Sequence, residues 1–255
     1  MACVRYARRF TLEPFAKGAP EALVVLLLDL GSCKKTLAPI AARWATAVPG
    51  AALLALDCQI LLSCDKFVTP DDAETGSERA ILAYATRLLE PLLALELHSR
   101  RLNPARLVLV GFGFGARLAL HLLLERGASC AGVLTFGARM SPRVPCNDAA
   151  GSKVRLIERA TQGESTSREL RDFVESLRAG GLDARAALAA GSVLSDAAIR
   201  HGTAYLVELV ATAQRGNGFR ARHAPPIIEH EGQGEPAWSA ACAASPAQRR
   251  QYERV

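Results

Sequence analysis

Short apolar runs alternate along the chain with segments of helical periodicity. Six runs are apolar at nearly every position, which predicts strands that helices cover on both faces. They are Ala22–Leu28, Ala51–Leu56, Arg106–Val110, Ala131–Phe136, Val154–Ile157 and Ala184–Ala190. The segments between them place apolar residues three or four apart, which predicts helices. They are Leu37–Val48, Ser77–His98 with a kink or break near Pro91, Ala116–Arg126, Ser167–Ala179 and a last helix from Ser195-Asp196 to about Gln214. The alternation predicts a doubly wound α/β domain with a mostly parallel sheet.

The two ends of the chain differ from this pattern. Residues 1–21 form a basic N-terminal extension, which is either a mitochondrial presequence or a basic edge segment of the fold. Residues 22–214 hold the α/β pattern. Residues 215–255 are rich in Gly, Pro, Ala and charge without a period, which predicts an extended tail that needs a partner surface.

Composition excludes several classes of protein. The chain has 255 residues, 50% of them hydrophobic, and its longest apolar run is far shorter than the ~20 residues that span a bilayer. Its net charge of +6 comes mostly from the two ends, without a Lys/Arg stripe and interleaved aromatics, so nucleic-acid binding is disfavoured. The seven cysteines show neither a CxxC pair nor metal-ligand spacing. We therefore predict neither metal nor cofactor.

A glycine-rich turn joins the third strand to the following helix. Gly111, Gly113 and Ala116 fit the G-x-G-x-x-G/A spacing of a dinucleotide-binding turn. However, the next strand ends at Phe136-Gly137 without the acid that would bind a ribose, and the turn follows the third strand instead of the first. A strand, tight turn and helix also form the nucleophile elbow of hydrolases, G-x-S-x-G, which the flanks favour.

These flanks carry a longer pattern. Asn103–Phe112 leads into the turn, Ala119–Leu122 follows in the helix, and Ala131–Gly137 forms the next strand. In order and spacing the pattern resembles the acyl-protein thioesterase and carboxylesterase family of α/β-hydrolases, which reads G-F-S-Q-G at the turn. Val24–Gly31 lies where this family has its oxyanion loop. The resemblance covers about residues 22–214 and implies an α/β-hydrolase fold.

The resemblance also implies where a catalytic triad would lie. Gly113 stands at the position of the serine, Gln162 about where the aspartate belongs, and Leu194 at that of the histidine. The loop that should stabilise an oxyanion has Leu28-Asp29-Leu30, and a carboxylate there would oppose a developing negative charge. Glycine has no side chain that could attack a carbonyl, but it adopts the positive φ of an elbow without strain.

The resemblance implies that the aromatic residues beside the elbow lie at what was the substrate pocket of the hydrolase family. Phe112 and Phe114 flank residue 113, and core packing is favoured over a ligand platform for both. A rebuilt Cys/His or Ser/His site is a further alternative, for which Cys33, Cys130 and His201 are candidates.

From these substitutions we predict that the chain is not an enzyme. It would serve as a structural or accessory subunit, contacting other protein subunits through its N-terminal extension and C-terminal tail. Two alternatives stay open: a protein that binds an acyl or lipid ligand, and a carboxylesterase or thioesterase with a displaced nucleophile. A mitochondrial location is predicted if residues 1–21 are a presequence, and a cytoplasmic one otherwise.

Overall fold

The structure of the protein is a computed structural model. It describes residues 9–12, 18–31, 34–59, 78–138, 151–160 and 164–215. The chain divides into two units, Met1–Phe219 and Arg220–Val255, and all of the described residues lie in the first. Gln162 and the predicted tail beyond Arg215 therefore lie outside the described residues.

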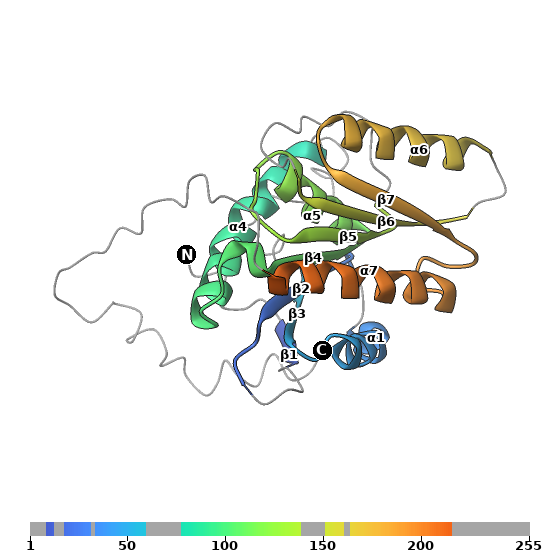
Figure 1. The fold of residues 1–255 in the computed structure, drawn as a ribbon. Coiled ribbons are helices and arrows are strands. Elements are labelled where there is room, and N and C mark those ends of the chain that lie inside the picture. Colours follow the sequence, from blue (N-terminus) through green and yellow to red (C-terminus); the bar gives the residue numbers. More distant parts are fainter. Residues whose placement is uncertain are drawn as a thin grey trace, which may run out of the picture. The chain divides into compact units, whose positions relative to one another are not determined.

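A sheet forms the centre of the first unit (Figure 1). In the described residues it has seven strands in the order β1-β3-β2-β4-β5-β6-β7. The strands are β1 Arg9–Leu12, β2 Ala22–Leu28, β3 Ala51–Asp57, β4 Leu107–Phe112, β5 Gly132–Phe136, β6 Lys153–Arg159 and β7 Asp183–Ala189. The helices are α1 Lys34–Ala47, α4 Glu78–Ser99, α5 Phe114–Leu124, α6 Glu164–Ala179 and α7 Asp196–Arg215, and a 3-10 turn, η2, covers Pro104–Arg106. All neighbouring strands pair in parallel except β1, which pairs antiparallel with β3.

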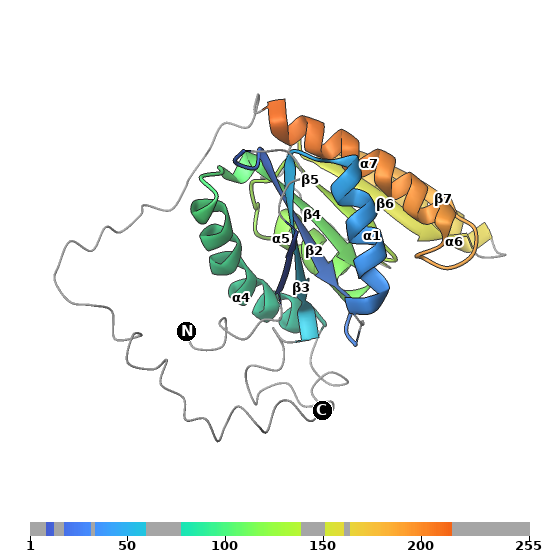
Figure 2. The ribbon, with the colours of Figure 1, turned by 90° about the horizontal axis from the view of Figure 1, so that it is seen from below.

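Helices cover both faces of the sheet. Alternation along β2 shows the two layers: Leu23, Val25 and Leu27 pack in the cluster formed with α4, α5 and α6, whereas Val24 and Leu26 pack in the one formed with α1 and α7. Figure 2 shows α1 and α7 next to each other on the same face. Both faces of each central strand are thus removed from water, which explains why those strands are apolar throughout.

The predicted elements agree well with the structure. All six predicted strands are present, and the mostly parallel, doubly wound arrangement is confirmed. Of the two predicted alternatives near Pro91, a kink or a break, the break is wrong, because α4 continues as one helix from Glu78 to Ser99. Proline removes one backbone hydrogen bond, but Leu89, Leu92 and Leu93 on either side are buried and hold the helix against the core.

The sheet also takes in part of the N-terminal segment. Arg9–Leu12 pairs with Leu53–Leu56 of β3, with Phe10 opposite Ala55 and Thr11 opposite Leu54. Phenylalanine and threonine favour extended backbone, and this strand adds the antiparallel edge. No described helix is both long and apolar enough to cross a membrane.

An aromatic cluster packs between α1, α7 and the end of β4. The Phe112 and Phe136 rings stack with centroids 4.9 Å apart, and Trp44 lies 6.1 Å and 5.9 Å from them. The indole Nε1 donates a hydrogen bond to Thr203 Oγ1 at 3.1 Å, so the polar atom of this buried ring has a partner. A Cβ on Gly202 would lie 2.4 Å from Phe136, so only glycine allows α7 this close to the sheet.

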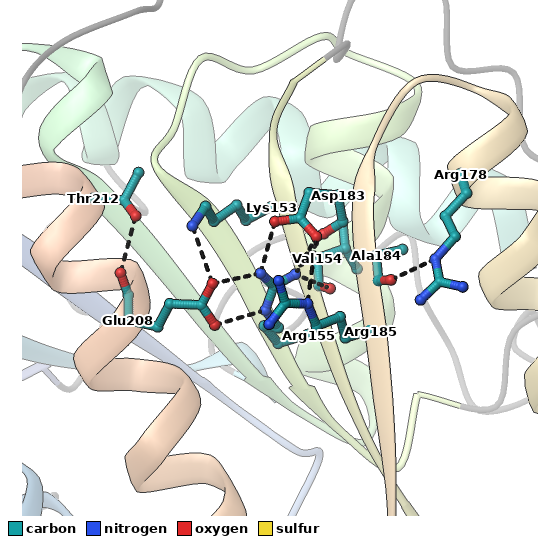
Figure 3. Close-up of polar contacts among 9 residues, drawn as sticks. All are labelled: Lys153, Val154, Arg155, Arg178, Asp183, Ala184, Arg185, Glu208 and Thr212. Atoms are coloured by element: carbon teal, nitrogen blue, oxygen red, sulfur yellow. Dashed lines mark hydrogen bonds and ion pairs between the residues drawn. The ribbon is translucent and has the colours of Figure 1, made fainter.

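A buried arginine joins α7 to the last two strands (Figure 3). Arg155 of β6 has no exposed side-chain surface. Its guanidinium donates to both carboxylate oxygens of Glu208 on α7, at 2.7 and 3.1 Å, and to Asp183 Oδ2 on β7, at 2.8 Å. Lys153 Nζ donates to the same Glu208 at 3.0 Å. We call Lys153, Arg155, Asp183 and Glu208 the arginine cluster.

Candidate functional site

The turn between β4 and α5 has the backbone geometry of an elbow. Gly113 has φ 51° and ψ −112°, a conformation that costs most residues ~1–3 kcal/mol. Its N–H donates to the carbonyl of Phe136 at 3.0 Å, which fixes the turn to the end of β5. Gly115 lets α5 approach β2, because a Cβ there would lie 2.1 Å from the carbonyl oxygen of Leu27. The glycines therefore maintain a sharp turn at the carboxyl end of the parallel strands.

The carboxylate of Asp29 occupies the space beside Gly113. Asp29 follows β2, the strand next to β4. A Cβ built on Gly113 would lie 2.2 Å from both Cγ and Oδ2 of Asp29. Real Cβ contacts are never this short, so the carboxylate stands where the side chain of an elbow residue would begin. Gly113 and Asp29 are thus complementary, since a side chain at position 113 would exclude the carboxylate.

Two backbone amides hold one oxygen of this carboxylate. Oδ1 of Asp29 accepts a hydrogen bond from the Phe114 N–H at 2.7 Å and another from the Leu30 N–H at 2.9 Å. Phe114 is the first residue of α5, where backbone N–H groups lack partners within the helix and the helix dipole favours negative charge. The elbow therefore binds an anionic oxygen at the position where such a turn offers its amide.

Further carboxylates lie at the same edge of the sheet. Glu158, near the end of β6, accepts the Ala138 N–H at 2.7 Å through Oε1. Asp57, at the end of β3, accepts the Gln59 N–H at 3.0 Å. The register pairs Asp57 with Leu28, directly before Asp29. The carboxyl ends of three parallel strands thus each carry an acid that accepts a backbone amide.

Of the other predicted site residues, Phe114 and Leu30 contact the Asp29 carboxylate through their backbone N–H groups. Phe112 and Phe114 are both buried, the first in the aromatic cluster and the second in the core with α4 and α5. Leu28 is buried in the opposite core, while Leu30 is 44% exposed. Leu194 is half-buried in the turn before α7 and packs against the core formed with α1 and α7.

The described cysteines are unsuited to attack a substrate. Cys58 and Cys130 are free and buried. Burial raises the pKa of Cys130 to about 12 and raises that of Cys58 further, with the nearby Asp57 and Asp29 adding to the effect. Both therefore stay protonated thiols at neutral pH. Cys33 lies outside the described residues.

The described histidines lie on helices: His98 on α4, His121 on α5 and His201 on α7. His121 is buried in α5, where burial lowers its pKa, and its Nδ1 lies 3.7 Å from Glu125. His201 is exposed on α7.

Ser195 caps α7: its hydroxyl donates to the carbonyl of Ala190 at 2.8 Å and accepts the Ala198 N–H at 3.3 Å. Among the described His, Cys, Asp and Glu, no group of three could hold a metal ion.

The fold is that of the α/β-hydrolases. The chain is similar to the solved structure of esterase PE8, with 22% identity and a TM-score of 0.62 over 78% of this chain and 97% of that one. It is also similar to a carboxylesterase from Bacillus cereus (14% identity, TM-score 0.60, 80% and 95% covered). A third structure is a dienelactone hydrolase-like promiscuous phosphotriesterase from metagenomic libraries. It has 16% identity and a TM-score of 0.59 over 82% of this chain and 95% of that one. No model of a protein family matches this chain, and a search of curated proteins finds no match either.

These comparisons correct the prediction that the chain is not an enzyme. Several solved structures that share its fold bear the names of esterases, carboxylesterases or dienelactone hydrolase-like proteins, so the likeness points to an enzyme family. The prediction rested on Gly113, Gln162 and Leu194, each taken by itself, without the contact between Gly113 and Asp29. A glycine cannot attack a carbonyl, but a carboxylate from the neighbouring strand occupies the same place.

Sequence reasoning thus located Asp29 but missed what it does. The prediction treated the carboxylate as an obstacle to an oxyanion. In the structure it is the group that the elbow amide binds. The available signal was the pairing of an acid after β2 with a glycine at the elbow. By itself, Gly113 lacks a side chain and Asp29 opposes an oxyanion. Together, the Asp29 carboxylate fills the space that a side chain at position 113 would take.

Proposed function

We propose that this chain is a hydrolase that cleaves an ester-class bond at the elbow, with an attacking group that does not come from residue 113. The observation that carries the proposal is the retained elbow: Gly113 keeps a positive φ, and the Phe114 amide binds an anionic oxygen. Esterase and carboxylesterase are also the names of solved structures that share the fold. This proposal keeps the alternative of a displaced nucleophile.

The test is a hydrolysis assay on the full-length protein with an aryl ester, an alkyl ester and a thioester of the same acyl group. We expect turnover of at least one substrate that scales with protein concentration and co-elutes with the chain in gel filtration. A Gly113→Val variant should lose this activity, because its side chain takes the place of the Asp29 carboxylate. A Gly151→Val variant is the matched control, since Gly151 also has a positive φ but faces open space. Absence of turnover with every substrate would contradict the proposal.

We also propose that the hydrolase works within a larger protein assembly in the mitochondrion. The support is sequence alone: residues 1–20 carry Arg5, Arg8, Arg9 and Lys17 against one acid, and the segment from Arg215 onward has six arginines and four glutamates. An extended tail like the one after Arg215 gains binding area when it orders on a partner. Native electrophoresis of a gentle extract tests this idea, since migration as a free monomer of 27.2 kDa would contradict it.

A further inference from the structure

We propose that Asp29 supplies the attacking oxygen of this hydrolase and that its substrates are thioesters. The inference rests on the proposed function, and it names the residue and the substrate class that the proposed function leaves unspecified. Its first support is position. Cγ and Oδ2 of Asp29 both lie 2.2 Å from the point where a Cβ on Gly113 would stand, so the carboxylate replaces an elbow side chain in space.

The second support is the difference between the two oxygens of Asp29. Oδ1 accepts two backbone N–H groups, at 2.7 and 2.9 Å. Within the part of the chain that the structure describes, Oδ2 has no hydrogen-bond or ion-pair partner. The residue is half-buried, and one of its oxygens is fixed by two amides while the other has no such partner. A carboxylate fixed in this way is an oriented nucleophile.

In the first step Oδ2 adds to the carbonyl carbon of a thioester. A C–O bond forms and the C–S bond breaks. The thiolate leaves with the electron pair of that bond and takes up a proton from solvent. The product on the enzyme is a mixed anhydride between the acyl group and Asp29. The step needs neither an oxidant nor a metal.

In the second step water adds to Cγ of Asp29. The negative charge of this tetrahedral intermediate develops on Oδ1, which the amides of Phe114 and Leu30 already hold at hydrogen-bond distance. Amides aimed at such an oxygen stabilise the transition state. The acyl carboxylate then leaves with Oδ2, and the two protons of water pass to solvent. The sum of both steps is thioester plus water to carboxylate, thiol and one proton.

The leaving group determines the substrate class. A carboxylate is a weak base, with a pKa near 3.9. When it adds to an alkyl ester, the competing leaving group is an alkoxide about as basic as hydroxide, whose acid has a pKa near 15.7. The carboxylate is then expelled again and no product forms. A thiolate, whose acid has a pKa near 8.5, departs far more readily. An attacking carboxylate therefore favours thioesters over alkyl esters.

The test compares two variants of the full-length protein with the wild type. Asp29→Asn keeps the shape and the Oδ1 acceptor but removes the nucleophile. Asp57→Asn is the matched control, because Asp57 is also half-buried at a strand end and also accepts a backbone amide. The substrates are the butyryl thioester of N-acetylcysteamine and ethyl butyrate. Thermal unfolding and circular dichroism report whether each variant folds.

We expect the wild type to hydrolyse the thioester at least about 100-fold faster than the ethyl ester, and Asp29→Asn to lose at least about 100-fold on the thioester. Asp57→Asn should stay within about twofold of the wild type. An acid-quenched sample of the wild type should also show an acyl adduct on the peptide that contains Asp29, which needs no variant to fold.

The outcomes separate the two proposals. If the wild type hydrolyses esters or thioesters and Asp29→Asn retains that activity without an acyl adduct at Asp29, the role of Asp29 is refuted and the proposed function stands. If the wild type prefers the ethyl ester, the thioester assignment is refuted. If it hydrolyses nothing, both proposals fall together.

Discussion

The amino ends of β6 and β7 and the carboxyl end of β2 use carboxylates in opposite ways. In the arginine cluster, Glu208 receives Arg155 on both oxygens and Lys153 on one of them. At the elbow, Asp29 has two amides on Oδ1 and, among the described residues, no partner on Oδ2. A carboxylate with both oxygens bound to cations anchors a helix, whereas one held by a single oxygen is oriented and still reactive. The comparison separates stability from chemistry within one fold.

Arg155 lowers the pKa of both its carboxylate partners. Hydrogen bonds from Arg155 hold the pKa of Glu208 at about 2, and those from Lys153 add to the effect. The pKa of Asp183 is lowered by the same arginine. Conversely, the hydrogen bonds and charges of these carboxylates offset the burial of Arg155 and keep its pKa raised. Arg155, Asp183 and Glu208 are therefore ionised throughout the physiological range. The ion pairs of the arginine cluster join α7 to β6 and β7.

The largest effect on stability should come from breaking the arginine cluster. Glu208→Gln leaves the fully buried Arg155 with Asp183 as its remaining carboxylate, and we expect a loss of about 3 kcal/mol in the free energy of unfolding. Glu125→Gln is the matched control. Glu125 is equally exposed, at 28%, but its partner Arg79 is 73% exposed, so its loss should cost less than about 1 kcal/mol.

Urea unfolding of both variants measures this difference. Equal losses for Glu208→Gln and Glu125→Gln would show that burial of Arg155 does not distinguish the two pairs. The elbow chemistry should be unaffected in either variant, since both carboxylates lie outside the residues that contact Asp29.

A smaller effect should follow from adding a methyl group at the elbow. Gly113→Ala pays the cost of a positive φ and also drives the new Cβ into Asp29, so we expect a loss of about 2 kcal/mol. Gly151→Ala has the same backbone cost in open space and should lose only about 1 kcal/mol.

The contact with Asp29 can be isolated by a double-mutant cycle. In an Asp29→Gly background, the cost of Gly113→Ala should fall to that of Gly151→Ala, because the clashing carboxylate is gone. A cost that stays the same in both backgrounds would show that Asp29 does not occupy the space beside residue 113.

The smallest effect concerns pH. The folded pKa of Glu208, about 2, lies below its ordinary value of 4.5, so its contribution to stability is present above pH 4.5 and is lost as pH falls toward 2. By pH 3.5 this loss should reach about 1 kcal/mol. Urea titrations between pH 6 and pH 3.5 should show a steeper decline for the wild type than for Glu208→Gln. Equal declines in the free energy of unfolding for the two proteins would contradict the assignment of the low pKa to Glu208.

Local sequence predicts the framework of this molecule but not the contacts that define its chemistry. The apolar runs gave the strands β2 to β7, because burial on both faces leaves a direct mark on the residues, and the glycine pattern located the elbow. The pair of Asp29 and Phe114 is separated by 85 positions, and that of Arg155 and Glu208 by 53. Such pairs depend on strand order and on where a helix crosses the sheet, which no local pattern contains. Gly113, Gln162 and Leu194, each taken by itself, therefore led to the wrong conclusion about activity.

The most direct test of the account follows oxygen through one turnover. The wild-type protein, in excess over the butyryl thioester, reacts once in water labelled with oxygen-18, and the peptide that contains Asp29 is analysed by mass spectrometry. If water adds to Cγ of Asp29, the label enters the Asp29 carboxylate and the released butyrate carries an oxygen from the enzyme. Label found only in butyrate, with Asp29 unlabelled, would contradict the account.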